Sequence, residues 1–248
     1  MLKSDWPPSP PHIQLHTDAI DIWLVGLEQS DAVRAKLWPL LNDEEQARAK
    51  RFYFDIHRHH FIVGRGLLRI LLGRYLEVAP EKIVFAYGDH GKPYLPNTTL
   101  NFNISHSYEM ALLAFTQGRE LGVDIEQIRP LEDAAAIARM NFSAKEVAEY
   151  TAVPDDQKPL AFYNCWTRKE AFIKAIGEGL SCPLDSFDVT LVPGEPAELL
   201  QVKGSLDEAR KWQLHTLNPV ERYVGAIIAT GQDWHLNCRQ WRDSDFST

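Results

Sequence analysis

The sequence predicts an α+β protein of two pseudo-symmetric lobes, each a small antiparallel sheet packed on one long helix. Three observations favour this class. Each half of the chain contains one long apolar helical stretch, ending near residue 75 in the first half and near residue 176 in the second. Each half also contains short strands separated by turn residues. The order of elements is the same in both halves: a strand, then a helix, then antiparallel strands. A boundary near Leu121 would separate an N-terminal lobe, residues 1–121, from a C-terminal lobe, residues 122–248.

Local signals define the elements of the first half. A strand is expected near residues 20–25, and a short helix follows that Ser30 caps and that must end by Trp38-Pro39. Three further strands are expected, and the first two of them are joined by a Gly-Asp-His-Gly turn at residues 88–91. These strands are residues 82–87, 100–105 and 110–116.

Two capping boxes mark the starts of helices. Asn42 and Glu45 have the required spacing and open a helical region that runs to residue 75, with a break near Phe54. Ser143 and Glu146 repeat the pattern in the second half. The repeated signal indicates that the two halves share a plan. Glu146 is accordingly interpreted as a helix cap rather than as a metal ligand.

The second half has the same kinds of element. A helix from about residue 159 to residue 176 corresponds to the long helix of the first half, and Gly177 ends it. The expected strands are residues 121–126, 186–191, 212–217 and 223–230. Asn218-Pro219 forms the turn between the last two.

Composition limits the classes of function. The chain has 248 residues, of which 45% are hydrophobic, so it can bury a substantial core. Its net charge of −8 counts against nucleic-acid binding. Three scattered cysteines fit a reducing compartment, and we find neither a signal peptide nor a membrane span. We therefore expect a cytoplasmic enzyme with a proline-rich N-terminal arm, residues 1–12.

One stretch is strongly basic within this acidic chain. Between residues 48 and 69, Asp55 is the only acidic residue. Two interpretations stay open: a solvated helix face, or a surface that binds phosphate. The basic residues of this stretch are Arg48, Lys50, Arg51, His57, Arg58, His59, His60, Arg65 and Arg69.

A group of carboxylates suggests a metal site. Val123 and Ile125 alternate with Asp124 and Glu126, so a strand would place both carboxylates on one face, where their charges repel. A divalent metal would relieve this repulsion, and Glu170 could complete the protein ligands. Magnesium typically takes its remaining ligands from water and substrate phosphates, which indicates phosphate chemistry.

Glu170 also has a simpler interpretation. Lys174 lies four residues after it, on the same side of the predicted helix. Such residues often form only a weak surface ion pair.

Five motifs in a fixed order resemble one known family. Each is weak evidence alone, but together they are similar to the signature of the Sfp-type 4′-phosphopantetheinyl transferases. The motifs are Gly91-Lys-Pro93, Phe102-Asn-Ile-Ser-His-Ser107, Gly122-Val-Asp-Ile-Glu126, Phe142-Ser-Ala-Lys-Glu146 and Trp166-Thr-Arg-Lys-Glu-Ala-Phe-Ile-Lys174.

The resemblance implies a pseudo-dimer that binds coenzyme A between its lobes. It implies transfer of the phosphopantetheine arm of coenzyme A to a serine of an acyl or peptidyl carrier protein. Mg²⁺, or Mn²⁺ in its place, would be held by Asp124, Glu126 and Glu170. Glu170 would accept the serine proton, directly or through a water on the metal, and Lys174 would hold the pyrophosphate. The pseudo-dimer would act as a monomer.

The resemblance also implies a nucleotide site. Ser105 and His106 would contact phosphate, although His106 could equally be an ordinary turn histidine. Lys92-Pro93 could be only a turn, but the resemblance implies that its backbone borders the adenine. Family members often carry two lysines three residues apart where this chain has Glu45 and Arg48. An acid cannot bind phosphate as lysine does. The candidates for the 3′-phosphate are therefore Arg48, Lys50, Arg58 and His60.

A second hypothesis is a non-catalytic module that binds coenzyme A or a carrier protein. All three carboxylates and Lys174 are present, which favours the transferase.

Overall fold

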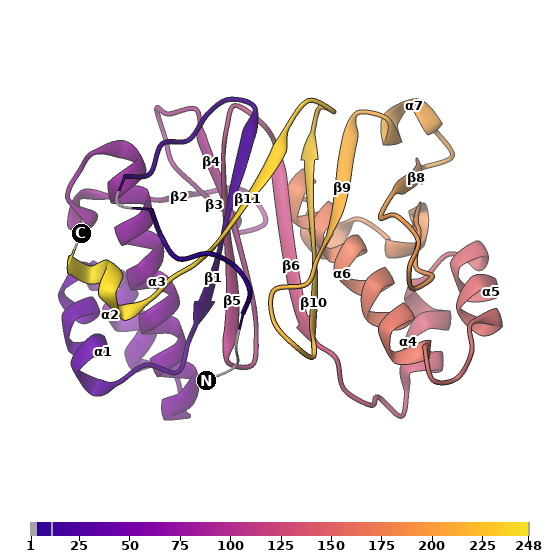
Figure 1. Ribbon diagram of the computed structural model, residues 1–248, viewed down its shortest axis with the longest axis horizontal. Coiled ribbons are helices and arrows are strands. Elements are labelled where there is room, and N and C mark those ends of the chain that lie inside the picture. Colours follow the sequence, from indigo (N-terminus) through magenta and orange to yellow (C-terminus); the bar gives the residue numbers. More distant parts are fainter. Residues whose placement is uncertain (1–3, 11, 248) are drawn as a thin grey trace.

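The computed structural model describes residues 4–10 and 12–247 and confirms the α+β class. Two sheets lie side by side in the middle of the molecule, and helices cover their outer sides (Figure 1). Part of the predicted N-terminal arm, residues 1–3 and 11, lies outside the described residues. Within the described part, the arm runs beside the end of the chain, where the Gln240 amide donates to the Pro7 carbonyl at 2.8 Å.

The first lobe contains a four-stranded sheet in the order β11-β1-β5-β4. Its strands are β1 (Ala19–Gly26), β4 (Leu100–Ser107), β5 (Met110–Gln117) and β11 (His235–Gln240). Its helices are α1 (Asp31–Leu37), α2 (Asp43–Lys50) and α3 (Asp55–Leu76). A hairpin of β2 (Ala86–Tyr87) and β3 (Pro93–Tyr94) leads into β4.

The second lobe contains a three-stranded antiparallel sheet in the order β6-β10-β9. Its strands are β6 (Leu121–Gln127), β9 (Trp212–Leu217) and β10 (Tyr223–Thr230). Its helices are α4 (Ala134–Asn141), α5 (Ala144–Ala152), α6 (Lys158–Ile176) and α7 (Leu206–Ala209). A small hairpin pairs β7 (Phe187–Val189) with β8 (Leu199–Val202).

Both predicted capping boxes are confirmed. Asn42 caps α2 and Ser143 caps α5, and in each case the Glu side chain three residues later accepts from the cap backbone amide. Ser30 caps α1 as expected. The predicted helix break near residue 54 is also confirmed, because α2 ends at Lys50 and α3 begins at Asp55.

Two predicted strands are too long. Only Ala86–Tyr87 of residues 82–87 is a strand, because the Ile83 carbonyl accepts from Arg69 instead of joining a sheet. The expected strand at residues 186–191 shortens to Phe187–Val189. The sequence analysis missed β3, α4, α7, β8 and β11, which are short or weakly patterned. No side chain caps α4, for example.

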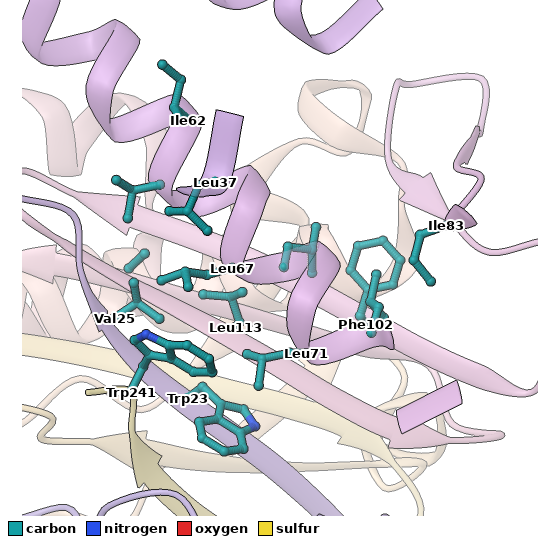
Figure 2. Packing of buried hydrophobic residues seen from close by; sticks show 14 of the residues in the cluster. Trp23, Val25, Leu37, Ile62, Leu67, Leu71, Ile83, Phe102, Leu113 and Trp241 are labelled. Carbon is teal, nitrogen blue, oxygen red and sulfur yellow. The ribbon is translucent and has the colours of Figure 1, made fainter. Parts of the chain in front are cut away.

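The last strand crosses the predicted lobe boundary. β11 pairs in parallel with β1, so the first sheet is antiparallel apart from this one pair. Trp241 follows β11 and packs against Trp23 of β1, with 6.3 Å between ring centroids (Figure 2). The end of the chain thus completes the first sheet, and the division at residue 121 stays a prediction.

Among residues 4–10 and 12–247, three apolar clusters form the core. One lies between α3 and the first sheet, where Leu67 and Leu71 face Leu113 (Figure 2). A second surrounds α6 and the second sheet. The third joins residues of both sheets, including Ile22 and Val123, which are fully buried. Burial of this third cluster fixes the two sheets against each other.

Candidate active site

Polar side chains of β4 join the two lobes. Asn103, Ser105 and Ser107 alternate along this strand, so they share one face, which meets β6 of the other sheet. The Ser105 hydroxyl donates to Asp124 Oδ1 at 2.7 Å, and the Ser107 hydroxyl donates to Glu126 Oε2 at 2.7 Å. Each of the two predicted strand carboxylates is therefore oriented by one serine.

The same face of β4 also bonds the free backbone edge of β6. The Val123 amide donates to Asn103 Oδ1 at 2.9 Å, and the Gln127 amide donates to Ser107 Oγ at 3.2 Å. β6 lies at the edge of its own sheet, so these side chains replace a backbone ladder. The sequence analysis did not single out Asn103 and Ser107. Their period-two spacing with Ser105 was the signal that could have found them.

Lys174 lies at the centre of this junction. Its Nζ donates to Asp124 Oδ1 at 2.6 Å and to Ser105 Oγ at 2.8 Å. The alternative of a surface ion pair between Glu170 and Lys174 is not found among the described residues, because Lys174 reaches across to β6 instead. A single site thus combines residues of β4, β6 and α6.

Negative charge accumulates beside Lys174. Burial raises the pKa of Glu126, and the nearby charges of Asp124 and Glu170 raise it further, against the Ser107 hydrogen bond and Lys174. Burial also raises the pKa of Glu170, with Asp124 adding to the effect and Lys174 opposing it. The Asp124 Oδ2 atom is buried and has no hydrogen-bond partner within the described chain. The charges of Asp124, Glu126 and Glu170 therefore influence one another beside Lys174.

These carboxylates suit a hard divalent cation in their chemistry. Oxygen donors are the ligands that Mg²⁺ prefers, and Asp124 Oδ2 is available. Within residues 4–10 and 12–247, however, no three His, Cys, Asp or Glu side chains are gathered closely enough to form a ready metal centre. The other carboxylate oxygen of Asp124, Oδ1, accepts a hydrogen bond from the Lys174 ammonium. The three-carboxylate metal site stays a prediction.

A large cavity adjoins the junction in the first lobe. It has a volume of about 900 Å³ and a largely apolar lining that includes Phe61 and Leu113. A second cavity of about 300 Å³ contains Glu170 and Lys174. The two cavities share the lining residues Gly91, Pro93 and Ile104, so they adjoin, and together they are called the cleft. First-lobe residues line the larger cavity, whereas residues of both lobes line the smaller one. Of the predicted nucleotide residues, the larger cavity contains Arg48, His60, Pro93, Ser105 and His106.

Three other predicted nucleotide residues have different surroundings. Lys50 lies over the Trp38 ring at 5.7 Å, and Arg58 pairs with Asp55 at 3.0 Å on the surface of α3. Neither lines the cleft cavities given above. Lys92 lines the smaller cavity, but its ammonium donates to backbone carbonyls of the second lobe.

Arg65 is a cleft residue that the sequence analysis did not choose. Its side chain is 94% buried, and its Nε lies 3.5 Å from Glu45 Oε1. In the described structure, its Nη1 has no hydrogen-bond partner. Glu45 is already bound to Arg69, whose Nε donates to Oε2 at 2.8 Å. Two buried arginines thus share one carboxylate, which leaves an excess positive charge beside the cleft. Glu45, at a position where family members often carry lysine, therefore has a structural role here: it takes part in a helix cap and in an ion pair.

The charged residues of the site gather at two places. Arg65 brings excess positive charge to the larger cavity, and the smaller cavity is lined by Glu170 and by Lys174, which binds Asp124. Such a distribution suits a substrate with separated phosphate groups.

Comparisons with known proteins identify the family. Residues 120–228 match the model of the 4′-phosphopantetheinyl transferase superfamily, and residues 30–118 match that of the 4′-phosphopantetheinyl transferase N-terminal region. 4′-Phosphopantetheinyl transferase HetI of Nostoc sp. is 38% identical over 238 residues, which are 94% of this chain and 97% of the relative. The chain belongs to the 4′-phosphopantetheinyl transferase superfamily, and the Sfp-type resemblance is confirmed.

Two relatives from Bacillus agree with this assignment. 4′-Phosphopantetheinyl transferase psf-1 of Bacillus pumilus is 31% identical, covering 80% of this chain and 90% of its own. 4′-Phosphopantetheinyl transferase Sfp of Bacillus subtilis is 36% identical over 61% of this chain and 66% of its own.

Proposed function

We propose that this enzyme transfers the 4′-phosphopantetheine group of coenzyme A to a serine of an acyl or peptidyl carrier protein. The serine oxygen forms a bond to the phosphorus that carries pantetheine. The bond from that phosphorus to the bridging pyrophosphate oxygen breaks, and adenosine 3′,5′-bisphosphate leaves with this oxygen. The observation that best supports the reaction is the junction of Lys174 with Asp124 and Ser105, beside adjoining cavities of about 300 and 900 Å³.

Residues of α6 supply the proton acceptor and the positive charge. Glu170 and Lys174 line the same small cavity, one helical turn apart. Glu170 accepts the proton of the attacking serine, because a carboxylate within reach of the hydroxyl raises its nucleophilicity. Lys174 holds the pyrophosphate and stabilises the charge that develops on the leaving oxygen.

Asp124, Glu126 and Glu170 would hold Mg²⁺, or Mn²⁺ in its place. When bound, the cation neutralises charge on the pyrophosphate. Ser105 and Ser107 keep Asp124 and Glu126 turned toward this site through their 2.7 Å hydrogen bonds.

The other end of the cleft recognises the nucleotide. Arg48 and His106 line the larger cavity, and Arg65 brings buried excess charge to its wall. We assign the 3′-phosphate to Arg48, Arg65 and His106, with His60 beside them. Pro93 and its backbone border the adenine. Lys50 and Arg58 are left out because they do not face the cleft.

Two further properties belong to this proposal. Both lobes of one chain contribute lining residues to the smaller cavity, which supports action as a monomer. A cytoplasmic location fits the carrier-protein substrate. No helix in the described part of the chain is long and apolar enough to span a membrane.

Intact mass spectrometry of a carrier protein tests the function. The purified enzyme, an apo carrier protein, coenzyme A and magnesium are incubated together. We expect the carrier to gain the mass of one phosphopantetheine group, and the gain to disappear when the acceptor serine is replaced by alanine. Binding of coenzyme A with no gain on acyl or peptidyl carriers would instead support a non-catalytic binding module.

A further inference from the structure

Lys92 makes an unusual set of contacts for a residue beside a nucleotide cleft. It lies between β2 and β3 in the first lobe, directly before Pro93. Its Nζ donates to the carbonyls of Leu121 at 3.2 Å, Lys174 at 2.5 Å and Ala175 at 3.0 Å. An ammonium group has three N–H donors. In the described structure, all three therefore have backbone acceptors in the second lobe.

The acceptors belong to the elements that carry the reaction. Lys174 and Ala175 are in the last turn of α6, where helix carbonyls lack partners within the helix and the helix dipole favours a cation. Leu121 is the first residue of β6, the strand that contains Asp124. Lys92 thus ties one hairpin of the first lobe to both catalytic elements of the second.

Nothing else in the described chain accounts for the burial of this cation. No carboxylate of the described residues lies within ion-pair distance of Lys92. Burial lowers the pKa of Lys92 to about 8, and the distant charge of Glu120 opposes this only in part. The three carbonyls are its recorded hydrogen-bond partners. Burial of a lysine ammonium without a counter-ion costs free energy. A function is therefore expected for its contacts.

The hairpin that carries Lys92 also lines the cleft. Gly91 and Pro93 border both cavities, one on each side of Lys92 in the sequence. The backbone that faces the nucleotide is therefore attached, through one side chain, to the last turn of α6. From that turn the Lys174 ammonium projects in the other direction, to Asp124.

We propose that Lys92 is a positioning residue that fixes the end of α6 against the nucleotide hairpin and thereby places Lys174 at the pyrophosphate. The inference rests on the proposed function. Lys92 does not bind coenzyme A through its ammonium, which leaves its backbone to border the adenine, as the resemblance implies. It acts through Lys174 and through the backbone of residues 91–93.

The proposal predicts a separation of binding from turnover. Lys92→Met keeps the length of the side chain but removes all three donors. We expect kcat to fall by about 10- to 100-fold, because small misplacements of catalytic groups have effects of this size. The affinity for adenosine 3′,5′-bisphosphate, measured by calorimetry, should change less than about threefold, since no ligand contact is lost. Lys92→Arg, which keeps the charge and several donors, should recover most of kcat.

Lys82→Met is the matched control, because Lys82 is an exposed lysine just before the same hairpin. It should leave both kcat and affinity unchanged. If Lys92→Met does not fold, Lys92→Gln replaces it, since the amide keeps two N–H donors without the charge.

Two results would overturn the proposal. One is a large loss of affinity for adenosine 3′,5′-bisphosphate in Lys92→Met with kcat preserved at saturation, which would make Lys92 a direct ligand. The other is wild-type kcat in Lys92→Met together with unchanged affinity. Absence of transfer by the wild-type enzyme would instead refute the proposed function, so the two failures are distinguishable.

Discussion

The long helices of the two lobes contain the same buried ion-pair arrangement. In the first lobe, the capping-box acid Glu45 pairs with Arg69 of α3 at 2.8 Å, and Arg69 also donates to the carbonyls of Pro80 and Ile83. In the second lobe, the four corresponding residues have the same relations. Glu146 pairs with Lys169 of α6 at 2.8 Å, and Lys169 donates to the carbonyls of Leu184 and Phe187.

The differences between the lobes lie beside this shared arrangement. Four residues before Arg69, the first lobe has Arg65 at the cleft, whereas four residues before Lys169 the second lobe has Cys165, an apolar core residue. Directly after Lys169 comes Glu170, whereas Ile70 follows Arg69. The comparison teaches that the repeated residues hold each lobe together. Under the proposed function, the residue added in the first lobe, Arg65, binds an anion, and the residue added in the second lobe, Glu170, takes part in the chemistry.

The largest expected effect tests whether the chemistry belongs to the second lobe. Asp124→Ala should lower the single-turnover rate of transfer by about 10²- to 10³-fold, because Lys174 loses the carboxylate that orients it. Rapid-quench mass analysis of the carrier measures the rate. Glu178→Ala, an exposed acid just after α6, is the control. A near-native rate for Asp124→Ala at millimolar magnesium would contradict the assignment.

Removal of the acid in each lobe tests the shared arrangement itself. Glu45→Ala and Glu146→Ala should each lower the free energy of unfolding by about 3–5 kcal/mol, because a buried cation then loses its partner. Urea unfolding measures both values. The two lobes would not be equivalent if one variant kept wild-type stability. Glu45→Lys should be worse than Glu45→Ala, since it would bury a third cation beside Arg65 and Arg69.

The excess arginine of the first lobe should determine nucleotide preference. Arg65→Met should reduce the preference for coenzyme A over dephospho-coenzyme A by about tenfold or more, the value of one charge-assisted hydrogen bond. The ratio of kcat/KM for the two donors measures it. Arg139→Met, on the exposed surface of α4, should leave the ratio unchanged. Equal use of both donors by the wild type would refute this nucleotide site.

The smallest expected effect concerns the basic residues outside the cleft. Lys50→Ala and Arg58→Ala should change stability by no more than about 0.5 kcal/mol, because surface substitutions rarely do more. Neither substitution should alter the ratio of kcat/KM for coenzyme A and dephospho-coenzyme A. A clear shift in that ratio would show that α2 or α3 presents a wider phosphate surface than the structure indicates.

The sequence by itself determined the local elements and the candidate chemistry. Capping boxes at Asn42 and Ser143, and the apolar period of the two long helices, were sufficient to locate α2, α3, α5 and α6. Period two along β6 was sufficient to place Asp124 on the face opposite Val123 and Ile125, although all three side chains are buried. These features could be predicted because each depends on residues a few positions apart.

Only the tertiary structure decided which charges meet. Lys174 binds Asp124, 50 residues away, rather than Glu170 on its own helix, and Lys92 reaches carbonyls 82 and 83 residues further along the chain. Likewise, β11 joins the first sheet rather than the second. No local sequence pattern predicts these partners, because the packing of whole helices and strands determines which charged groups and which strand edges meet. In this protein, burial of apolar side chains between the two sheets makes that choice.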